Sequence, residues 1–229
     1  MELYIVRHGQ STNNALADRS ERVADPPLTP LGRRQAEMVA QHLATGMVKV
    51  PDGELRPYGI GRLYCSAMER ALDTAQVMGS ALGLVPEVWL DIHEVGGIYL
   101  DGPEGPEGYA GKTRQEIEDE YPGFVLPDGI TDEGWWNRPR EDRRARLLRA
   151  GRVVAALRER AGGDERIALV THGGFVNVLQ KVLFRQAAGT NMWFDLYNTA
   201  ISRIDFYADG HVSVQFLNRV DHLPPELVT

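Results

Sequence analysis

Two short apolar runs, each closed by a histidine and then a glycine, constrain the fold of this 229-residue chain more than any other feature. Residues 3–6 run directly into Arg-His-Gly at 7–9, and residues 167–170 run into Thr-His-Gly at 171–173. Continuous apolar runs of this length are typical of strands buried on both faces, as in a parallel sheet covered by helices. The sequence therefore predicts two buried strands that deliver the two histidines to one edge of a sheet.

Further strand and helix patterns alternate along the chain, which favours an α/β fold. We expect a three-layer fold with a mostly parallel central sheet flanked by helices, formed by residues 1–229 as a single domain. Thr29 is expected to cap the helix that begins at Pro30, and Ser66 to cap the helix that follows it. The other predicted strands are 61–66, 85–90 and a hairpin of 198–207 with 211–217. The predicted helices are 30–43, 67–82, 141–161 and 175–184. In the helix 141–161, the residues expected to face inward are Leu147, Leu148, Val154 and Leu157.

One long segment interrupts this alternation. Residues 96–140 are rich in glycine, proline and acidic residues, and a loop of that length inside a compact domain is usually functional or disordered. We interpret it as an inserted cap or lid over the carboxyl end of the sheet. Within it we expect a short helix at 113–120 and an apolar anchor at Trp135 and Trp136.

Charge and composition narrow the classes of partner. The formal net charge is −7 and the sequence pI is about 5.4, so neither nucleic acid nor a membrane is an expected partner. The arginine-rich stretch 138–152 is interpreted as a solvated helix face. A single cysteine, Cys65, and the lack of a signal peptide or of roughly 20 consecutive apolar residues predict a cytoplasmic protein. The sequence leaves open whether the chain acts as a homodimer.

The residues near the predicted sheet edge are suited to phosphoryl chemistry. Ligands of open α/β sheets bind at the carboxyl ends of strands, where helix N-termini also point. A lone histidine there is more often structural, but two, each followed by glycine, favour a functional site. We expect the glycine after each histidine to let backbone amides approach an anion closely. His8 can act as nucleophile through one ring nitrogen, and Arg7 and Arg70 carry planar charged groups that match phosphate. Glu94 follows a predicted strand and is a candidate acid, and Asn14 is a neutral donor.

Four blocks of the sequence resemble a known family. Residues 6–14, Val-Arg-His-Gly-Gln-Ser-Thr-Asn-Asn, resemble the signature of the histidine phosphatase superfamily, also called the phosphoglycerate mutase-like family. Residues 27–36 resemble its next block, and residues 66–75 resemble the block that brings a second phosphate-binding arginine. Residues 170–174 resemble the block around its second histidine. The blocks stand in the family's order.

The resemblance implies a mechanism and a set of site residues. His8 would attack phosphorus and become a phosphohistidine, and Glu94 would protonate the departing oxygen and later help to deliver water or an acceptor hydroxyl. No metal and no other cofactor is implied for a phosphatase. The residues expected around the phosphoryl oxygens are Arg7, Arg70, His172 and Asn14, with Gln10 and Gly173 as further substrate contacts. Two departures stand out: position 10 is Gln where the family often has Glu, and the residues after Glu94 lack an aromatic-glutamate pattern.

Several functions are compatible with these motifs. The leading hypothesis is a metal-independent phosphatase that hydrolyses phosphate monoesters of small metabolites. The first alternative is a cofactor-dependent phosphoglycerate mutase, which returns the phosphoryl group to a substrate hydroxyl. The acidic character of segment 96–140 favours the phosphatase, because such mutases carry basic residues there for the substrate carboxylate. Less favoured are a non-catalytic protein that binds phosphorylated ligands and a nucleic-acid-binding protein.

Overall fold

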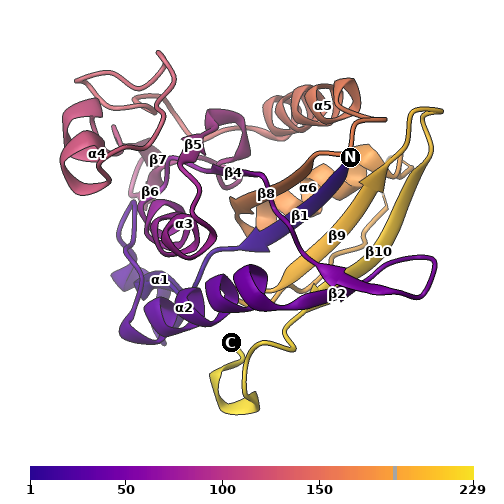
Figure 1. The fold of residues 1–229 in the computed structure, drawn as a ribbon. Helices are drawn as coiled ribbons and strands as arrows, with labels where there is room; N and C mark the ends of the chain where they lie inside the picture. Colours follow the sequence, from indigo (N-terminus) through magenta and orange to yellow (C-terminus); the bar gives the residue numbers. More distant parts are fainter. Residues whose placement is uncertain (188–189) are drawn as a thin grey trace.

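A six-stranded sheet forms the centre of the computed structural model, which describes residues 1–187 and 190–229. The strand order is β10-β9-β1-β8-β4-β5 (Figure 1). Strands β1, β8, β4 and β5 are parallel, whereas β9 runs antiparallel to β1 and to β10. The mostly parallel sheet predicted from the sequence is thus confirmed. The strands are β1 (Glu2–Arg7), β4 (Arg62–Cys65), β5 (Pro86–Val88), β8 (Arg166–Thr171), β9 (Ile201–Phe206) and β10 (Val212–Arg219).

Helices cover both faces of this sheet and enclose two hydrophobic cores. Successive side chains of a strand point to opposite faces, and β1 follows this rule. Tyr4 and Val6 pack in the core beneath α2 and α3, whereas Leu3 and Ile5 pack in the core beneath α5 and α6. Figure 1 shows these two helix pairs on opposite sides of the sheet, which gives the predicted three layers. The helices are α2 (Pro30–Thr45), α3 (Glu69–Leu82), α5 (Arg143–Glu159) and α6 (Gly173–Leu183).

Local capping explains one predicted helix start and corrects another. The Thr29 hydroxyl accepts a hydrogen bond from the Gly32 amide at 2.9 Å, with Pro30 in the first turn, so α2 begins as predicted. The prediction that Ser66 caps α3 is wrong. Helix α3 begins later, after Met68, and the Ser66 hydroxyl accepts instead from the Met68 amide at 3.3 Å. Ser66 therefore closes a turn that precedes the helix.

The inward face of α5 differs from the prediction. Val154 and Leu157 are buried as expected, together with Val153. Leu147 and Leu148 are 38% and 59% exposed, so their predicted inward orientation is wrong. The buried residues of α5 begin at Arg149, so the face of the helix that packs on the core starts after the two leucines.

The inserted segment 96–140 folds into small elements of its own. It contains the hairpin of β6 (Tyr99–Gly102) and β7 (Gly105–Gly108) and the helix α4 (Arg114–Glu120), close to the predicted helix. The anchor prediction is confirmed, because Trp135 and Trp136 are 6% and 5% exposed and both rings contact His93. Short elements that the sequence did not indicate are α1 (Thr12–Ala15), β2 (Met47–Lys49), β3 (Leu55–Pro57) and the 3₁₀ turns η1 (Arg19–Glu21), η2 (Leu90–Ile92) and η3 (Pro225–Leu227). Within the described ranges, none of the helices has the length and apolarity needed to cross a bilayer.

Candidate active site

The two histidines meet where β1 and β8 end side by side. The register pairs Arg7 with Thr171, and the His8 amide donates to the Thr171 carbonyl at 2.9 Å. The next residue of each strand is a histidine, and the ring centroids of His8 and His172 lie 5.0 Å apart. Parallel pairing thus brings together two residues that are far apart in the sequence, as the repeated apolar-run pattern predicted.

Hydrogen bonds define the protonation of the His8 ring. Its Nδ1 lies 2.6 Å from the Gly9 carbonyl oxygen, and its Nε2 lies 3.1 Å from Nε of Arg70. A guanidinium can only donate, so Nε2 must carry the lone pair, and Nδ1 must donate its proton to the carbonyl. Burial, followed by the charges of Arg70 and Arg7, lowers the pKa of His8 well below its ordinary value. The ring is therefore neutral at pH 7, with Nε2 available as a nucleophile.

Arginines and the second histidine surround this nitrogen. Arg7 is the last residue of β1, its Nη1 donates to the Leu196 carbonyl, and its Nε is buried. Arg70 lies in the first turn of α3 and is 8% exposed. His172 is fully buried, and within residues 1–187 and 190–229 neither of its ring nitrogens has a hydrogen-bond partner. Buried polar atoms usually have partners, but His172 is not among the residues that line the cavity in front of His8, so its ring lies behind that of His8.

Glu94 is held by backbone amides at the start of α6. Its carboxylate accepts from the amides of Val95 at 2.8 Å, Phe175 at 2.8 Å and Gly174 at 3.1 Å. Carboxylates are stabilised at helix N-termini. A Cβ on Gly174 would lie 2.4 Å from the Glu94 Oε1, so glycine is required there for this approach. In the sequence, Gly174 stood out only as the last residue of the block 170–174 around the second histidine.

The remaining predicted substrate contacts fall in different places. Asn14 lines the cavity, and its Oδ1 accepts from the Ser11 amide at 3.1 Å in the capping box of α1. Gln10 is not among the residues that line the cavity, because its Oε1 accepts from the Thr29 hydroxyl at 2.8 Å. Gly173 does not line it either and lies behind Arg7.

The glycine after His8 has a role that differs from the one expected. We expected its backbone amide to approach an anion, but the Gly9 amide donates to the Thr74 hydroxyl at 3.1 Å. A Cβ on Gly9 would lie 2.4 Å from the Gly32 carbonyl oxygen. Glycine is therefore needed there because the loop after β1 packs directly on the backbone of α2.

The cavity in front of His8 has a volume of about 360 Å³ and is strongly cationic. Among the residues that the structure describes, four arginines line it together with one carboxylate, that of Glu94. The protein as a whole is acidic, so positive charge is concentrated here, as an anionic substrate requires. Sequence reasoning missed several lining residues because they come from separate short segments that only the fold brings together: Ser11, Asn13, Arg19, Arg22, Tyr99 and Trp193.

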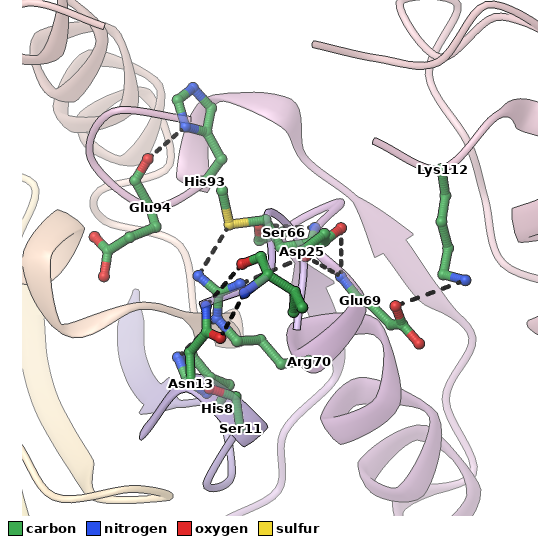
Figure 2. Close-up of polar contacts among 12 residues, drawn as sticks. His8, Ser11, Asn13, Asp25, Ser66, Glu69, Arg70, His93, Glu94 and Lys112 are labelled. Carbon is green, nitrogen blue, oxygen red and sulfur yellow. Dashed lines mark hydrogen bonds and ion pairs between the residues drawn. The ribbon is translucent and has the colours of Figure 1, made fainter. Parts of the chain in front are cut away.

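A carboxylate network supports Arg70 from behind. Asp25 accepts hydrogen bonds from the Glu69 amide at 3.2 Å, and its Oδ1 lies 3.5 Å from Nη1 of Arg70 (Figure 2). Burial raises the pKa of Asp25 to about 6, although the charge of Arg70 acts against this rise. Lys112 of the insertion lies 3.8 Å from the Glu69 carboxylate, which connects the insertion to the start of α3. Among the residues described, no three His, Cys, Asp or Glu side chains are placed to share a metal ion.

Comparison with known proteins assigns the family. A sequence profile of the histidine phosphatase superfamily (branch 1) matches residues 3–219, so this chain belongs to that superfamily. A probable phosphoglycerate mutase, GpmB of Yersinia pestis, is 26% identical over 210 residues, which are 90% of this chain and 85% of that protein. The relatives found are phosphatases or phosphoglycerate mutase-type enzymes, and this chain is an enzyme of one of these two kinds.

Solved structures share the fold. Phosphoserine phosphatase from Entamoeba histolytica, solved with 3-phosphoglyceric acid, superposes with a TM-score of 0.62 at 19% identity and covers 97% of this chain and 99% of its own. A mycobacterial glucosyl-3-phosphoglycerate phosphatase, solved with VO₃, gives a TM-score of 0.59 at 22% identity, with 96% and 99% covered. At these identities the similarity shows a common fold.

Proposed function

We propose that this protein is a metal-independent phosphatase that hydrolyses small phosphate monoesters through a phosphohistidine on His8. The observation that carries the proposal is the neutral His8 ring, whose Nε2 lone pair faces a cationic cavity while Nδ1 is held by the Gly9 carbonyl. A histidine fixed in this tautomer can attack phosphorus without first losing a proton.

In the first step, the Nε2 lone pair of His8 forms a bond to phosphorus and the bond from phosphorus to the ester oxygen breaks. Glu94 must enter this step in its protonated form, and it gives that proton to the departing oxygen, so the product leaves as a neutral alcohol. The hydrogen bond from Arg70 to Nε2 must first turn to a phosphoryl oxygen, since the same nitrogen cannot serve both. The oxygens around phosphorus would be bound by Arg7, Arg70, His172 and Asn14.

In the second step, water attacks the phosphohistidine from the side that the alcohol has left. Glu94, now ionised, accepts a proton from this water, and the bond from phosphorus to Nε2 breaks to release inorganic phosphate. The enzyme returns to its starting state, because the Glu94 proton and the His8 lone pair are both restored. Gln10 and Gly173, which do not line the cavity, are assigned indirect roles: Gln10 fixes the loop through Thr29, and Gly173 leaves room for Arg7.

A phosphoglycerate mutase is the second candidate, favoured by the relationship to the probable phosphoglycerate mutase of Yersinia pestis. It would share the first step and replace water with a substrate hydroxyl. The cavity supports hydrolysis instead, because Gly97 and Tyr99, the residues of segment 96–140 that line it, are uncharged. Arg140 lies 4.8 Å from the Tyr99 ring centroid and is not among the lining residues. A cytoplasmic location and a cap function for segment 96–140 stay predictions from the sequence, which leaves a homodimer open.

The test is release of inorganic phosphate, without added metal, from a panel that includes phosphoserine and 3-phosphoglycerate. Wild type should hydrolyse at least one of them, and His8→Ala should be inactive. His211→Ala, which changes an exposed histidine in the turn before β10, is the matched control and should keep full activity. Acid-labile, base-stable phosphate on wild type but not on His8→Ala would identify the intermediate. Isomerisation of 3-phosphoglycerate that exceeds phosphate release would favour the mutase.

A further inference from the structure

A second cavity of about 400 Å³ lies directly beside the active site. Val95, Gly174 and Trp193 line both cavities, so these three residues are the wall between them. Two of the three also fix the acid, because the amides of Val95 and Gly174 hold the Glu94 carboxylate. The wall therefore stands where the leaving oxygen of a substrate would receive its proton.

The second cavity carries positive charge that the protein itself leaves uncompensated. Arg143 and Arg146 come from the first turns of α5, and Lys181 comes from α6. No carboxylate within the described residues lines this cavity or forms an ion pair with any of the three. Three unpaired cations around one cavity, in a chain with a net charge of −7, form an attractive position for an anion.

Apolar side chains lie between these cations and the wall. Leu147, which the sequence assigned to the core, is 38% exposed and lines the cavity with Val178. Trp193 is 58% exposed, and the Lys181 ammonium lies 6.0 Å from its ring centroid. An exposed indole beside apolar side chains can hold a ring or an alkyl segment. Leu147 is therefore exposed because it lines this second cavity and does not pack in the core.

We propose that this second cavity, defined by Arg143, Arg146 and Lys181 with Leu147, Val178 and Trp193, binds the far end of the substrate's leaving group. The proposal rests on the proposed phosphatase function. The leaving group crosses the wall at Val95 and Gly174, places an apolar or ring-shaped body against Trp193 and ends in a second anion between the three cations. The substrate class is therefore an extended phosphomonoester with a distal phosphate or carboxylate.

The test uses α,ω-alkanediol bisphosphates of increasing chain length, each compared with the alkyl monophosphate of the same length. Wild type should prefer the bisphosphate at one length, where the second phosphate reaches the cations, by about tenfold in kcat/KM. Arg146→Ala/Lys181→Ala should abolish this preference while leaving kcat/KM for the shortest monophosphate unchanged. Arg34→Ala/Arg144→Ala removes the same charge from exposed positions outside both cavities and should keep the preference.

The two proposals fail in different ways. If wild type hydrolyses none of the esters, the phosphatase function fails. If wild type hydrolyses the monophosphates but shows no preference at any length, the second cavity does not bind the leaving group. The same conclusion follows if both double variants reduce the preference equally, because the effect then comes from net charge. A preference lost only in Arg146→Ala/Lys181→Ala supports the proposal.

Discussion

At the scale of single residues, the position of Glu94 is decided by three backbone amides and one missing Cβ. The carboxylate is held at the N-terminus of α6, beside the wall that Val95, Gly174 and Trp193 form between the two cavities. The proposed acid role gives a specific expectation. A leaving oxygen of high basicity needs a proton in the transition state, whereas a nitrophenolate does not. The identity of the leaving group should therefore reveal what Glu94 does.

We expect Glu94→Gln to lower kcat for an alkyl phosphate by about 10² to 10⁴-fold, because a general acid contributes that much. The loss for 4-nitrophenyl phosphate should be much smaller. Steady-state kinetics with both esters measure the difference. Thermal unfolding of the variant and of wild type checks that the new side chain still accepts hydrogen bonds from the backbone amides at the start of α6. Equal losses for the two esters would show that Glu94 only supports the structure.

Asp25 gives a second expectation at this scale, on pH. Its pKa is raised to about 6, so it is ionised at pH 7.5 and becomes protonated as the pH falls through 6. Protonation removes the negative charge that faces Arg70. In wild type we expect KM to rise below about pH 6, by roughly fivefold if the contact is worth about 1 kcal/mol.

Asp25→Asn is neutral at every pH, so its KM should already be raised at pH 7.5 and should change less on acidification. The second ionisation of a phosphate ester also falls near pH 6, but it affects both proteins equally. The difference between the two pH profiles is therefore the quantity to read. Identical profiles would mean that Asp25 does not act through Arg70.

At the scale of secondary-structure elements, Arg149 joins α5 to the segment that carries Glu94. Its guanidinium donates to the Glu141 carboxylate at 2.6 and 2.7 Å and to the carbonyls of Asp91 at 2.7 Å and His93 at 2.9 Å. Arg149 is 3% exposed. The expectation of a solvated arginine face on this helix is therefore wrong at this position, because helix α5 turns Arg149 toward the η2 turn.

We expect Arg149→Met to lower the free energy of unfolding by about 3 to 5 kcal/mol, because it leaves the buried Glu141 carboxylate without a partner. Urea denaturation measures the change. Arg152→Met is the matched control, because Arg152 lies on the same helix and forms an ion pair with Asp91, but its side chain is 61% exposed. We expect this variant to lose about 1 kcal/mol or less. Equal losses for the two variants would contradict a special role for the buried pair.

At the scale of the whole molecule, buried histidines couple stability to pH. Burial lowers the pKa of His8 and His172 well below the ordinary value, and lowers that of His93 to about 3. In the unfolded chain these groups titrate near 6.5. Below that pH the unfolded state binds more protons than the folded state, so stability falls as the pH falls. Burial raises the pKa of Asp25 and Glu69, which therefore act in the opposite direction. They are outnumbered, because burial also lowers the pKa of His42 and His222.

We therefore expect the free energy of unfolding to decrease from pH 7.5 to 5.5, with each buried histidine contributing up to about 1.4 kcal/mol per pH unit below 6.5. Urea denaturation at several pH values measures the slope. His93→Phe should reduce the slope of stability against pH by the contribution of one buried histidine. His211→Asn, which changes an exposed histidine, should leave the slope unchanged. Stability that stays flat or rises on acidification would contradict the burial of neutral histidines.

The sequence by itself determined the features that depend on contiguous residues. The two apolar runs that end in His-Gly predicted two buried strands that bring His8 and His172 to one edge of the sheet, and the Thr29-Pro30 pair predicted the start of α2. Periodicity and capping are local properties, because they arise from neighbouring side chains and backbone groups. The family followed from the same contiguous blocks.

Only the tertiary structure decided which distant residues complete the site. The contact between Glu94 and the start of α6, the support of Arg70 by Asp25 and the wall shared by two cavities each join segments that are far apart in the chain. The same holds for the exposure of Leu147 and the burial of Arg149, which reverse what their residue types favour. These features depend on how layers pack against one another, and no local pattern encodes that packing.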